Sequence, residues 1–217
     1  MIDVNAAFSA RYAQARVKFL EGAATAGLAI RSFEHPLKGR DGETLAMDVA
    51  LDGPADAQNL LIVSSACHGV EGYCGSGVQV FATHDAEWRA KARAAGVAVL
   101  YIHALNPHGF SHVRRVTNEN VDLNRNFPTP GWDKEATHYW HKRTGKDPRR
   151  FPGRTPLSEP ESRWVHDEMA RWKPDLIVSV HAPYGVLDFD GPKLSQQLPG
   201  ITAEHLPAKP EADYFTN

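Results

Sequence analysis

The chain has 217 residues, of which 42% are hydrophobic and 23% are charged, and its formal net charge is -2 at pH 7. This length and apolar content suffice to bury the core of one domain, and the near-neutral charge excludes a generally basic surface for nucleic acid. No apolar run approaches the roughly 20 residues that a membrane-spanning helix needs, so we expect no membrane partner.

The N-terminus and the cysteines bear on the cellular compartment. Residues 1–5 lack the basic and apolar regions of a secretory signal. Cys67 and Cys74 are too few for a disulfide scaffold and are consistent with a reducing compartment. We therefore expect a cytoplasmic protein. The sequence gives no indication of its oligomeric state.

The first expected elements are a helix and a hairpin. Residues 4–24 carry apolar side chains at spacings of three and four, which predicts an amphipathic helix that ends near residues 22–27. The residues of this stripe are Phe8, Tyr12, Ala15 and Phe19. Residues 29–37 and 44–51 are separated by a segment that contains Asp41-Gly42, so they are expected to form a hairpin.

The middle of the chain alternates strands and helices. The continuously apolar runs 60–66, 97–105 and 176–182 are typical of strands that are covered on both faces. Helices are expected at 75–84 and 86–95, and a third follows the capping-box pair Ser158 and Glu161 and ends before Pro174. This order predicts an α/β fold with a mixed, centrally parallel sheet flanked by helices, and ligands at the carboxyl ends of its strands.

Two segments depart from this pattern. Residues 128–156 are rich in proline, glycine, aromatic and basic residues, and we expect a long surface insertion with one helical turn around residues 135–141. From about residue 190 the chain is rich in proline and poor in large apolar groups, which predicts a weakly structured tail. We interpret residues 1–217 as one domain that contains both segments.

A zinc site is the clearest chemical prediction. His68 and Glu71 stand three residues apart just after one apolar run, and His181 closes another. Each alone is typical of a structural or solvent-facing residue, but together they place metal-type ligands at two strand ends. Catalytic zinc needs three nitrogen or oxygen ligands and one open position. Cys67 and Cys74 are alternative ligands, although Cys67 should point away from the face that His68 uses.

Four further residues suggest chemistry around that metal. Asp122 is either a turn residue or the partner that orients a metal-bound imidazole. Asn124 and Arg125 are either ordinary surface residues or an amide and a guanidinium that grip a carboxylate. Arg115 has the chemistry to polarise a scissile carbonyl.

The order of these motifs resembles that of the zinc carboxypeptidases of the M14 class. The resemblance is closest to their small bacterial branch, which includes murein-peptide amidases, and it spans roughly residues 59–192. The ordered set is far more specific than any single motif. Its members are His68-x-x-Glu71, Asn106-Pro107-x-Gly109-Phe110, Arg115, Asp122-Leu123-Asn124-Arg125-Asn126 and His181.

The resemblance implies a metallopeptidase that holds one zinc ion through His68, Glu71 and His181. It implies that Arg115 polarises the carbonyl, that Asp122 orients His68, and that Asn124 with Arg125 binds the substrate's terminal carboxylate. The expected reaction is hydrolysis of an amide bond next to a free carboxylate, with peptidoglycan-derived peptides as a substrate class. The main alternative is a zinc-dependent deacylase that acts on N-acyl amino acids.

One part of the family pattern is missing. The family's general base is a glutamate on a later strand, and the only later candidates, Glu204 and Glu211, do not follow an apolar strand. We therefore expect the chain to be C-terminally incomplete. The alternative is a catalytically inactive relative that keeps the zinc or ligand site.

The remaining site candidates have simpler interpretations. Tyr184 follows His181 closely and either lines the pocket or packs beside the strand end. Several other histidines are expected to be solvated or hydrogen-bonded, with a second metal site as the alternative. They are His103, His108, His112, His138 and His141.

Overall fold

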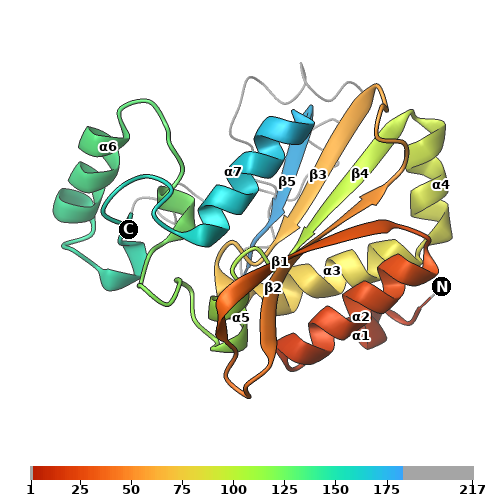
Figure 1. The fold of residues 1–217 in the computed structure, drawn as a ribbon, viewed down its shortest axis with the longest axis horizontal. Helices are drawn as coiled ribbons and strands as arrows, with labels where there is room; N and C mark the ends of the chain where they lie inside the picture. The colour runs from red at the N-terminus through yellow and green to blue at the C-terminus, as the bar shows by residue number, and fades with distance from the viewer. Residues whose placement is uncertain (1, 183–217) are drawn as a thin grey trace, which may run out of the picture. The chain divides into compact units, whose positions relative to one another are not determined.

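Five strands form one mixed sheet in residues 2–182, the part of the chain that the computed structural model describes. Their order in space is β1-β2-β4-β3-β5 (Figure 1). The strands are β1 (Ala29–Lys38), β2 (Thr44–Asp52), β3 (Asn59–Ser65), β4 (Val97–His103) and β5 (Leu176–Val180). Strand β3 is parallel to β4 and β5, whereas β2 is antiparallel to β1 and β4. The predicted hairpin and the mixed sheet with a parallel centre are confirmed.

Helices connect and cover these strands. The α-helices are α1 (Val4–Ala7), α2 (Tyr12–Thr25), α3 (Gly72–His84), α4 (Ala86–Ala94), α5 (Pro107–Ser111), α6 (Trp132–His138) and α7 (Pro160–Trp172). Shorter helical turns are η1 (Gly69–Glu71), η2 (Leu123–Arg125), η3 (Tyr139–Arg143) and η4 (Pro148–Arg150). None of the described helices is long and apolar enough to cross a membrane.

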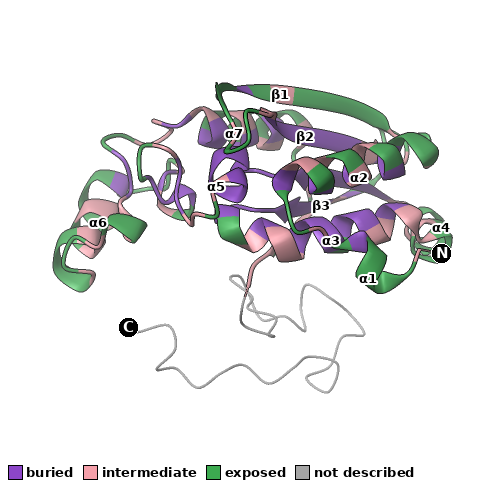
Figure 2. Ribbon diagram, turned by 90° about the horizontal axis from the view of Figure 1, so that it is seen from below, coloured by how far each residue is buried: buried purple, intermediate pink, exposed green. Residues whose placement is uncertain are grey.

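The central strands are buried on both faces because successive side chains point to opposite sides of the sheet. Ile62 and Leu100 belong to a core cluster that includes Val165 of α7. Their neighbours Val63 and Tyr101 belong to a second cluster, which contains residues of α2 and α3. Figure 2 shows the result as buried β2 and β3 beneath the largely exposed edge strand β1. This two-sided burial explains why β3 and β4 read as continuous apolar runs. The expectation is wrong for the run 176–182, because β5 lies at the edge of the described sheet and alternates half-buried and exposed residues, with Ile177 48% exposed.

The predicted N-terminal helix is wrong in one respect, because the structure divides it. Helix α1 is capped by Asp3, and the chain becomes extended at Phe8 before α2 begins. Phe8 lies so close to Gly77 of α3 that a Cβ atom there would meet the ring at 2.3 Å. Phe8 therefore lies in an extended segment against α3 and is not part of a helix. Tyr12, Ala15 and Phe19 are buried on α2, as expected.

The predicted capping box of α7 is also wrong. Its N-cap is Glu159, which makes no side-chain capping hydrogen bond. Ser158 Oγ instead donates to Glu159 Oε1 at 2.9 Å. Glu161 turns into the core, where its Oε1 lies 3.2 Å from His35 Nε2. The buried pair with β1 therefore replaces the local cap.

The segment 128–156 is more ordered than one helical turn. Helix α6 leads directly into the π-helical turn η3, and Trp140 Nε1 donates to Asp147 O at 2.9 Å. Trp132 at the start of α6 is buried. That the segment is an insertion into one domain spanning residues 1–217 stays a prediction. The tail from about residue 190 and Tyr184 lie outside the described residues.

Candidate metal centre

The candidate ligands reach one edge of the sheet through two neighbouring strands. His68 follows β3 and precedes η1, which ends at Glu71, and His181 follows β5 directly. Because β3 and β5 are parallel neighbours, their carboxyl ends lie at the same edge. Ala66, with a φ of 61°, turns the chain at the end of β3, and its carbonyl accepts a hydrogen bond from Asn106 N at 3.0 Å.

A close backbone contact fixes η1 beside the next loop. A Cβ atom on Gly69 would lie 2.1 Å from the carbonyl carbon of Gly109, so only glycine fits there. Gly69 N donates to Arg115 O at 3.0 Å, and Val70 N donates to Arg114 O at 2.8 Å. These contacts hold the Arg115 segment against the turn that carries Glu71.

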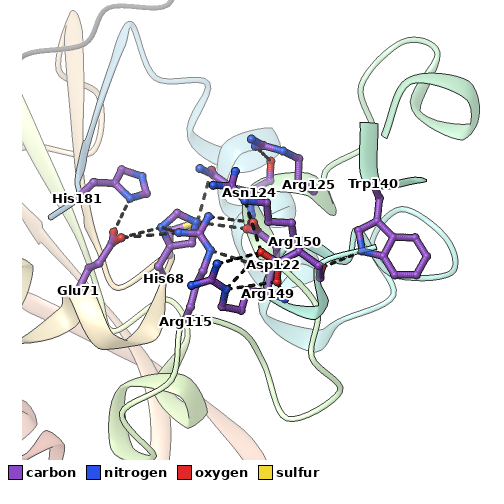
Figure 3. Close-up of polar contacts among 12 residues, drawn as sticks. His68, Glu71, Arg115, Asp122, Asn124, Arg125, Trp140, Arg149, Arg150 and His181 are labelled. Atoms are coloured by element: carbon purple, nitrogen blue, oxygen red, sulfur yellow. Dashed lines mark hydrogen bonds and ion pairs between the residues drawn. The ribbon is translucent and has the colours of Figure 1, made fainter. Parts of the chain in front are cut away.

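The three donor groups converge (Figure 3). His68 Nδ1 lies 3.0 Å from Glu71 Oε1, and His181 Nδ1 lies 2.7 Å from Glu71 Oε2. One ligand atom from each residue lies within 4.8 Å of the other two. Burial raises the pKa of Glu71, but hydrogen bonds with His181 and His68 outweigh it and lower the pKa to about 2. An ionised carboxylate and two imidazoles could therefore form a metal site.

Asp122 contacts the other side of the His68 ring. Its Oδ1 lies 3.3 Å from His68 Nε2, while His68 Nδ1 faces Glu71. Burial disfavours the charged imidazole, but the contacts with Asp122 and Glu71 together raise the pKa of His68. Burial also raises the pKa of Asp122, whereas the contact with His68 and the charge of Arg115 lower it to about 2. Asp122 therefore lies against the His68 imidazole, and its expected role in orienting that ring stays a prediction.

Arg115 is fixed beside the donors. Its Nη2 donates to Asp122 Oδ2 at 3.0 Å, and its Nε donates to Arg149 O at 3.2 Å. Nη1 lies 3.2 Å from His68 Nδ1 and 4.0 Å from Glu71 Oε1. The guanidinium is therefore held beside His68 and Glu71, two of the three donors.

Asn124 and Arg125 lie on η2, the turn that Asp122 caps by accepting a hydrogen bond from Asn124 N at 3.1 Å. Arg125 Nη1 donates to Asn124 O at 3.1 Å, and its guanidinium carbon lies 5.1 Å from the ring centroid of Tyr139. Both residues line a cavity of about 330 Å³. Its other lining residues are Phe127, Thr129, Trp132, Glu135, Ala136 and Tyr139.

The two thiols stay outside the donor group. The described residues that converge as a metal-type group are two histidines and a glutamate, with no cysteine among them. Cys67 is buried, and its Sγ points to Asn124 Oδ1 at 3.6 Å. Burial raises the pKa of Cys67 to about 12, so the thiol keeps its proton at neutral pH.

Glu204 and Glu211, which the sequence offered as candidates for the general base, lie outside the described residues.

The other histidines form no second metal-type group of three ligands within residues 2–182. His103 is buried, and its Nε2 lies 2.7 Å from Ser76 Oγ. The expectation that these residues are solvated or hydrogen-bonded is wrong for His108. This ring is buried, stacks on His112 with centroids 4.1 Å apart, and its Nδ1 has no partner among the described residues.

Sequence reasoning missed two features of the surroundings. The carbonyl of Arg149 holds Arg115, and aromatic residues of segment 128–156 line the cavity beside Arg125. The tryptophans and tyrosines in that proline-rich stretch were the available signal, because large aromatic side chains dominate the energetics of cores and binding surfaces.

Comparison with known proteins finds a relative similar in sequence and solved structures with a similar fold. Murein peptide amidase A from Escherichia coli (strain K12) is 34% identical over 86 residues, which are 39% of this chain and 36% of that protein. The chain thus matches about a third of the length of this curated relative. Carboxypeptidase A from Helicoverpa armigera superposes with a TM-score of 0.55 at 18% identity, covering 82% of this chain and 46% of the other.

A second solved structure gives the same fold. Bovine thrombin-activatable fibrinolysis inhibitor, in complex with tick carboxypeptidase inhibitor, has a TM-score of 0.54 at 14% identity and covers 82% of this chain and 64% of the other. The carboxypeptidase fold expected from the motifs is confirmed. A model of the family described as "Protein of unknown function (DUF2817)" matches residues 8–142, more than half of the sequence. The chain therefore belongs to the DUF2817 family.

Proposed function

We propose that this protein is a zinc-dependent hydrolase of carboxypeptidase type, which cleaves an amide bond next to a free carboxylate. The observation that carries the proposal is the convergence of His68, Glu71 and His181 at the sheet edge within 4.8 Å of one another. Asp122 behind His68 and Arg115 beside Glu71 complete an arrangement that has no evident packing role.

The donor set fits zinc. Two imidazole nitrogens and one carboxylate oxygen are ligands that catalytic zinc sites use, and such sites keep a further position open. His68 has a carboxylate at its second nitrogen, as metal-bound imidazoles commonly do. A bound zinc ion would supply Lewis acidity at the scissile amide and a means to activate water at neutral pH.

Arg115 is suited to stabilise charge on the substrate's carbonyl oxygen. Its guanidinium is fixed before substrate arrives, by Asp122 on one side and the carbonyl of Arg149 on the other. A preoriented cation lowers the barrier because it needs no reorganisation when negative charge develops. Its Nη1 lies near the metal-type donors, where the scissile carbonyl would have to lie.

Asn124 and Arg125 are the proposed anchor for the substrate's free carboxylate. An amide N–H and a guanidinium are both donors to a carboxylate. The adjoining cavity of about 330 Å³ offers room for part of a peptide. The name of the Escherichia coli relative, murein peptide amidase A, supports peptidoglycan-derived peptides as the substrate class.

The test is hydrolysis by the zinc-loaded chain, with zinc content measured on the same samples. The substrates are short peptide acids, the same peptides with an amidated C-terminus, peptidoglycan-derived peptides and N-acyl amino acids. We expect cleavage of peptide acids that is lost with a chelator and restored by zinc. Amidated peptides should react at least about tenfold more slowly, because they lack the charge-assisted contact with Arg125.

Two results would contradict the proposal. Stoichiometric zinc with no turnover of any substrate would identify a metal-binding protein and not a hydrolase. Faster cleavage of N-acyl amino acids than of every peptide would identify a deacylase.

A further inference from the structure

The thiol of Cys67 contacts the amide of Asn124. Cys67 is 4% exposed and directly precedes His68, whereas Asn124 is exposed on η2. The Sγ atom lies 3.6 Å from Asn124 Oδ1, within range for a hydrogen bond that involves sulfur. These residues are far apart in sequence and meet only because η2 lies beside the end of β3.

We infer that Cys67 is a positioning residue that sets the orientation of the Asn124 amide. The inference rests on the proposed function, in which Asn124 donates to the substrate's carboxylate. A thiol that donates to Oδ1 holds the oxygen of the amide inward and leaves both Nδ2 hydrogens free to face the ligand. The opposite orientation would turn Oδ1 toward the incoming carboxylate and repel it.

No other hydrogen bond among the described residues holds this side-chain amide. The remaining hydrogen bonds of Asn124 within residues 2–182 use its backbone: its N donates to Asp122 Oδ1, and its O accepts from Arg125 Nη1. These bonds fix the backbone of the turn and involve neither polar atom of the side-chain amide. Since Cys67 is also the neighbour of His68, the thiol links the carboxylate contact to the metal-type donors through a single peptide bond.

The kinetic test compares Cys67→Ala and Cys67→Ser with the wild type, on the zinc-loaded chain and a peptide acid. Cys74→Ala is the matched control, because Cys74 lies on α3 and the hydrogen bond from a thiol to Asn124 that the described structure shows comes from Cys67. We expect Cys67→Ala to raise KM about fivefold, the loss of one neutral hydrogen bond, with kcat within about twofold of the wild type. Serine, which also donates a hydrogen bond, should restore KM.

A double-mutant cycle separates this role from general packing. On an Asn124→Ala background, Cys67→Ala should raise KM no further, because the group that the thiol orients is already absent. An unchanged KM in Cys67→Ala, no rescue by serine, or an equal penalty on the Asn124→Ala background would each overturn the inference.

A spectroscopic readout keeps the inference testable if the proposed function fails. The side-chain amide signals of Asn124, assigned by their loss in Asn124→Ala, should move in Cys67→Ala, stay in place in Cys74→Ala, and return in Cys67→Ser. Identical signals in the wild type and Cys67→Ala would overturn the positioning role whether or not any peptide is cleaved. Absence of hydrolysis with the expected shifts would overturn the proposed function alone.

Discussion

The molecule places histidines in two different settings. The edge histidines, His68 and His181, follow strands β3 and β5 and direct Nδ1 atoms at the carboxylate of Glu71. The core histidines are His35, His103 and His108. They contact a glutamate, a serine and neighbouring rings, but within the described residues they do not converge as a group of three metal-type ligands.

Burial alone does not identify the edge setting, because the His181 side chain is 34% exposed while His68 is as buried as the core histidines. His68 is 5% exposed and the core histidine His108 is 7% exposed. The difference lies in where the donor atoms point: Glu71 receives two imidazoles, whereas Glu161 faces only His35 in the described structure. A metal site is therefore recognised by the convergence of its donors, and a buried histidine alone indicates only a polar group within the core.

The largest effect should follow from removing an edge histidine. We expect His68→Ala and His181→Ala to lower zinc content from about one equivalent to background, because the site then keeps two of three protein ligands. His108→Gln should retain the zinc of the wild type. Elemental analysis of the purified proteins measures this, and loss of zinc in His108→Gln alone would reverse the assignment of the two settings.

The contact between Glu161 and His35 in the core should contribute to the free energy of unfolding. Glu161→Ala leaves His35 Nε2 buried without the carboxylate that lies 3.2 Å away. We expect this change to lower the free energy of unfolding by about 1 to 3 kcal/mol, the cost of leaving a buried polar group without a polar neighbour. Urea denaturation measures it, and the folded variant should bind zinc normally.

A surface glutamate provides the control. Glu87 on α4 is exposed and pairs with Lys91 at 2.7 Å. Glu87→Ala should change the free energy of unfolding by less than about 1 kcal/mol, because solvent screens exposed pairs. Equal losses in the two variants would show that the His35 contact contributes no more than a surface pair.

The core histidines should also make stability depend on pH. Burial lowers the pKa of His103 to about 4, below the value near 6.5 expected in the unfolded chain. Between these two values the unfolded state binds the proton and the folded state does not, so this contribution to stability is lost as pH falls. The loss should be on the order of 3 kcal/mol at pH 4 and absent above pH about 7.

The variant His103→Gln isolates that contribution. Its free energy of unfolding should fall less steeply than that of the wild type between pH about 6.5 and 4, since glutamine does not titrate. Chemical denaturation at a series of pH values gives both slopes. Parallel slopes would mean that His103 takes up its proton in the folded protein, at an ordinary pKa.

The sheet and the edge histidines could be predicted because local sequence determines them. Continuous apolar runs marked β3 and β5, and a parallel pair brings the residues after both strands to one edge. The order of motifs added the expected roles of Asp122 and Arg115. The sheet edge needed only strand periodicity and the positions of polar residues along the chain, whereas the roles of Asp122 and Arg115 came from the resemblance to the zinc carboxypeptidases.

The remaining features depend on contacts between distant segments. Asp122 reaches His68 along a loop whose path is set by the hydrogen bond from Asp122 N to Phe151 O at 2.7 Å. The cavity beside Arg125 needs α6, and the break at Phe8 needs Gly77. No helical or strand period encodes such contacts, so the sequence predicts their residue types but not their partners.

The smallest expected change concerns the carboxylate behind the edge histidine. Asp122→Asn preserves the shape of the side chain but removes the charge that faces His68 Nε2 and Arg115 Nη2. We expect zinc affinity to fall about 10- to 100-fold, the usual effect of losing such a partner. Competition with a chromophoric chelator measures the dissociation constant.

Asp147→Asn tests whether the charge matters through His68 or through the arginines. Asp147 pairs with Arg149 at 3.1 Å, as Asp122 pairs with Arg115 at 3.0 Å, but the structure shows it in no contact with an edge histidine. Its zinc affinity should therefore match the wild type. If both variants lost zinc affinity equally, negative charge beside the arginines would strengthen zinc binding, and the contact of Asp122 with His68 would have no separate effect. If neither did, the contact between Asp122 and His68 would serve the fold, as the contact between Glu161 and His35 does.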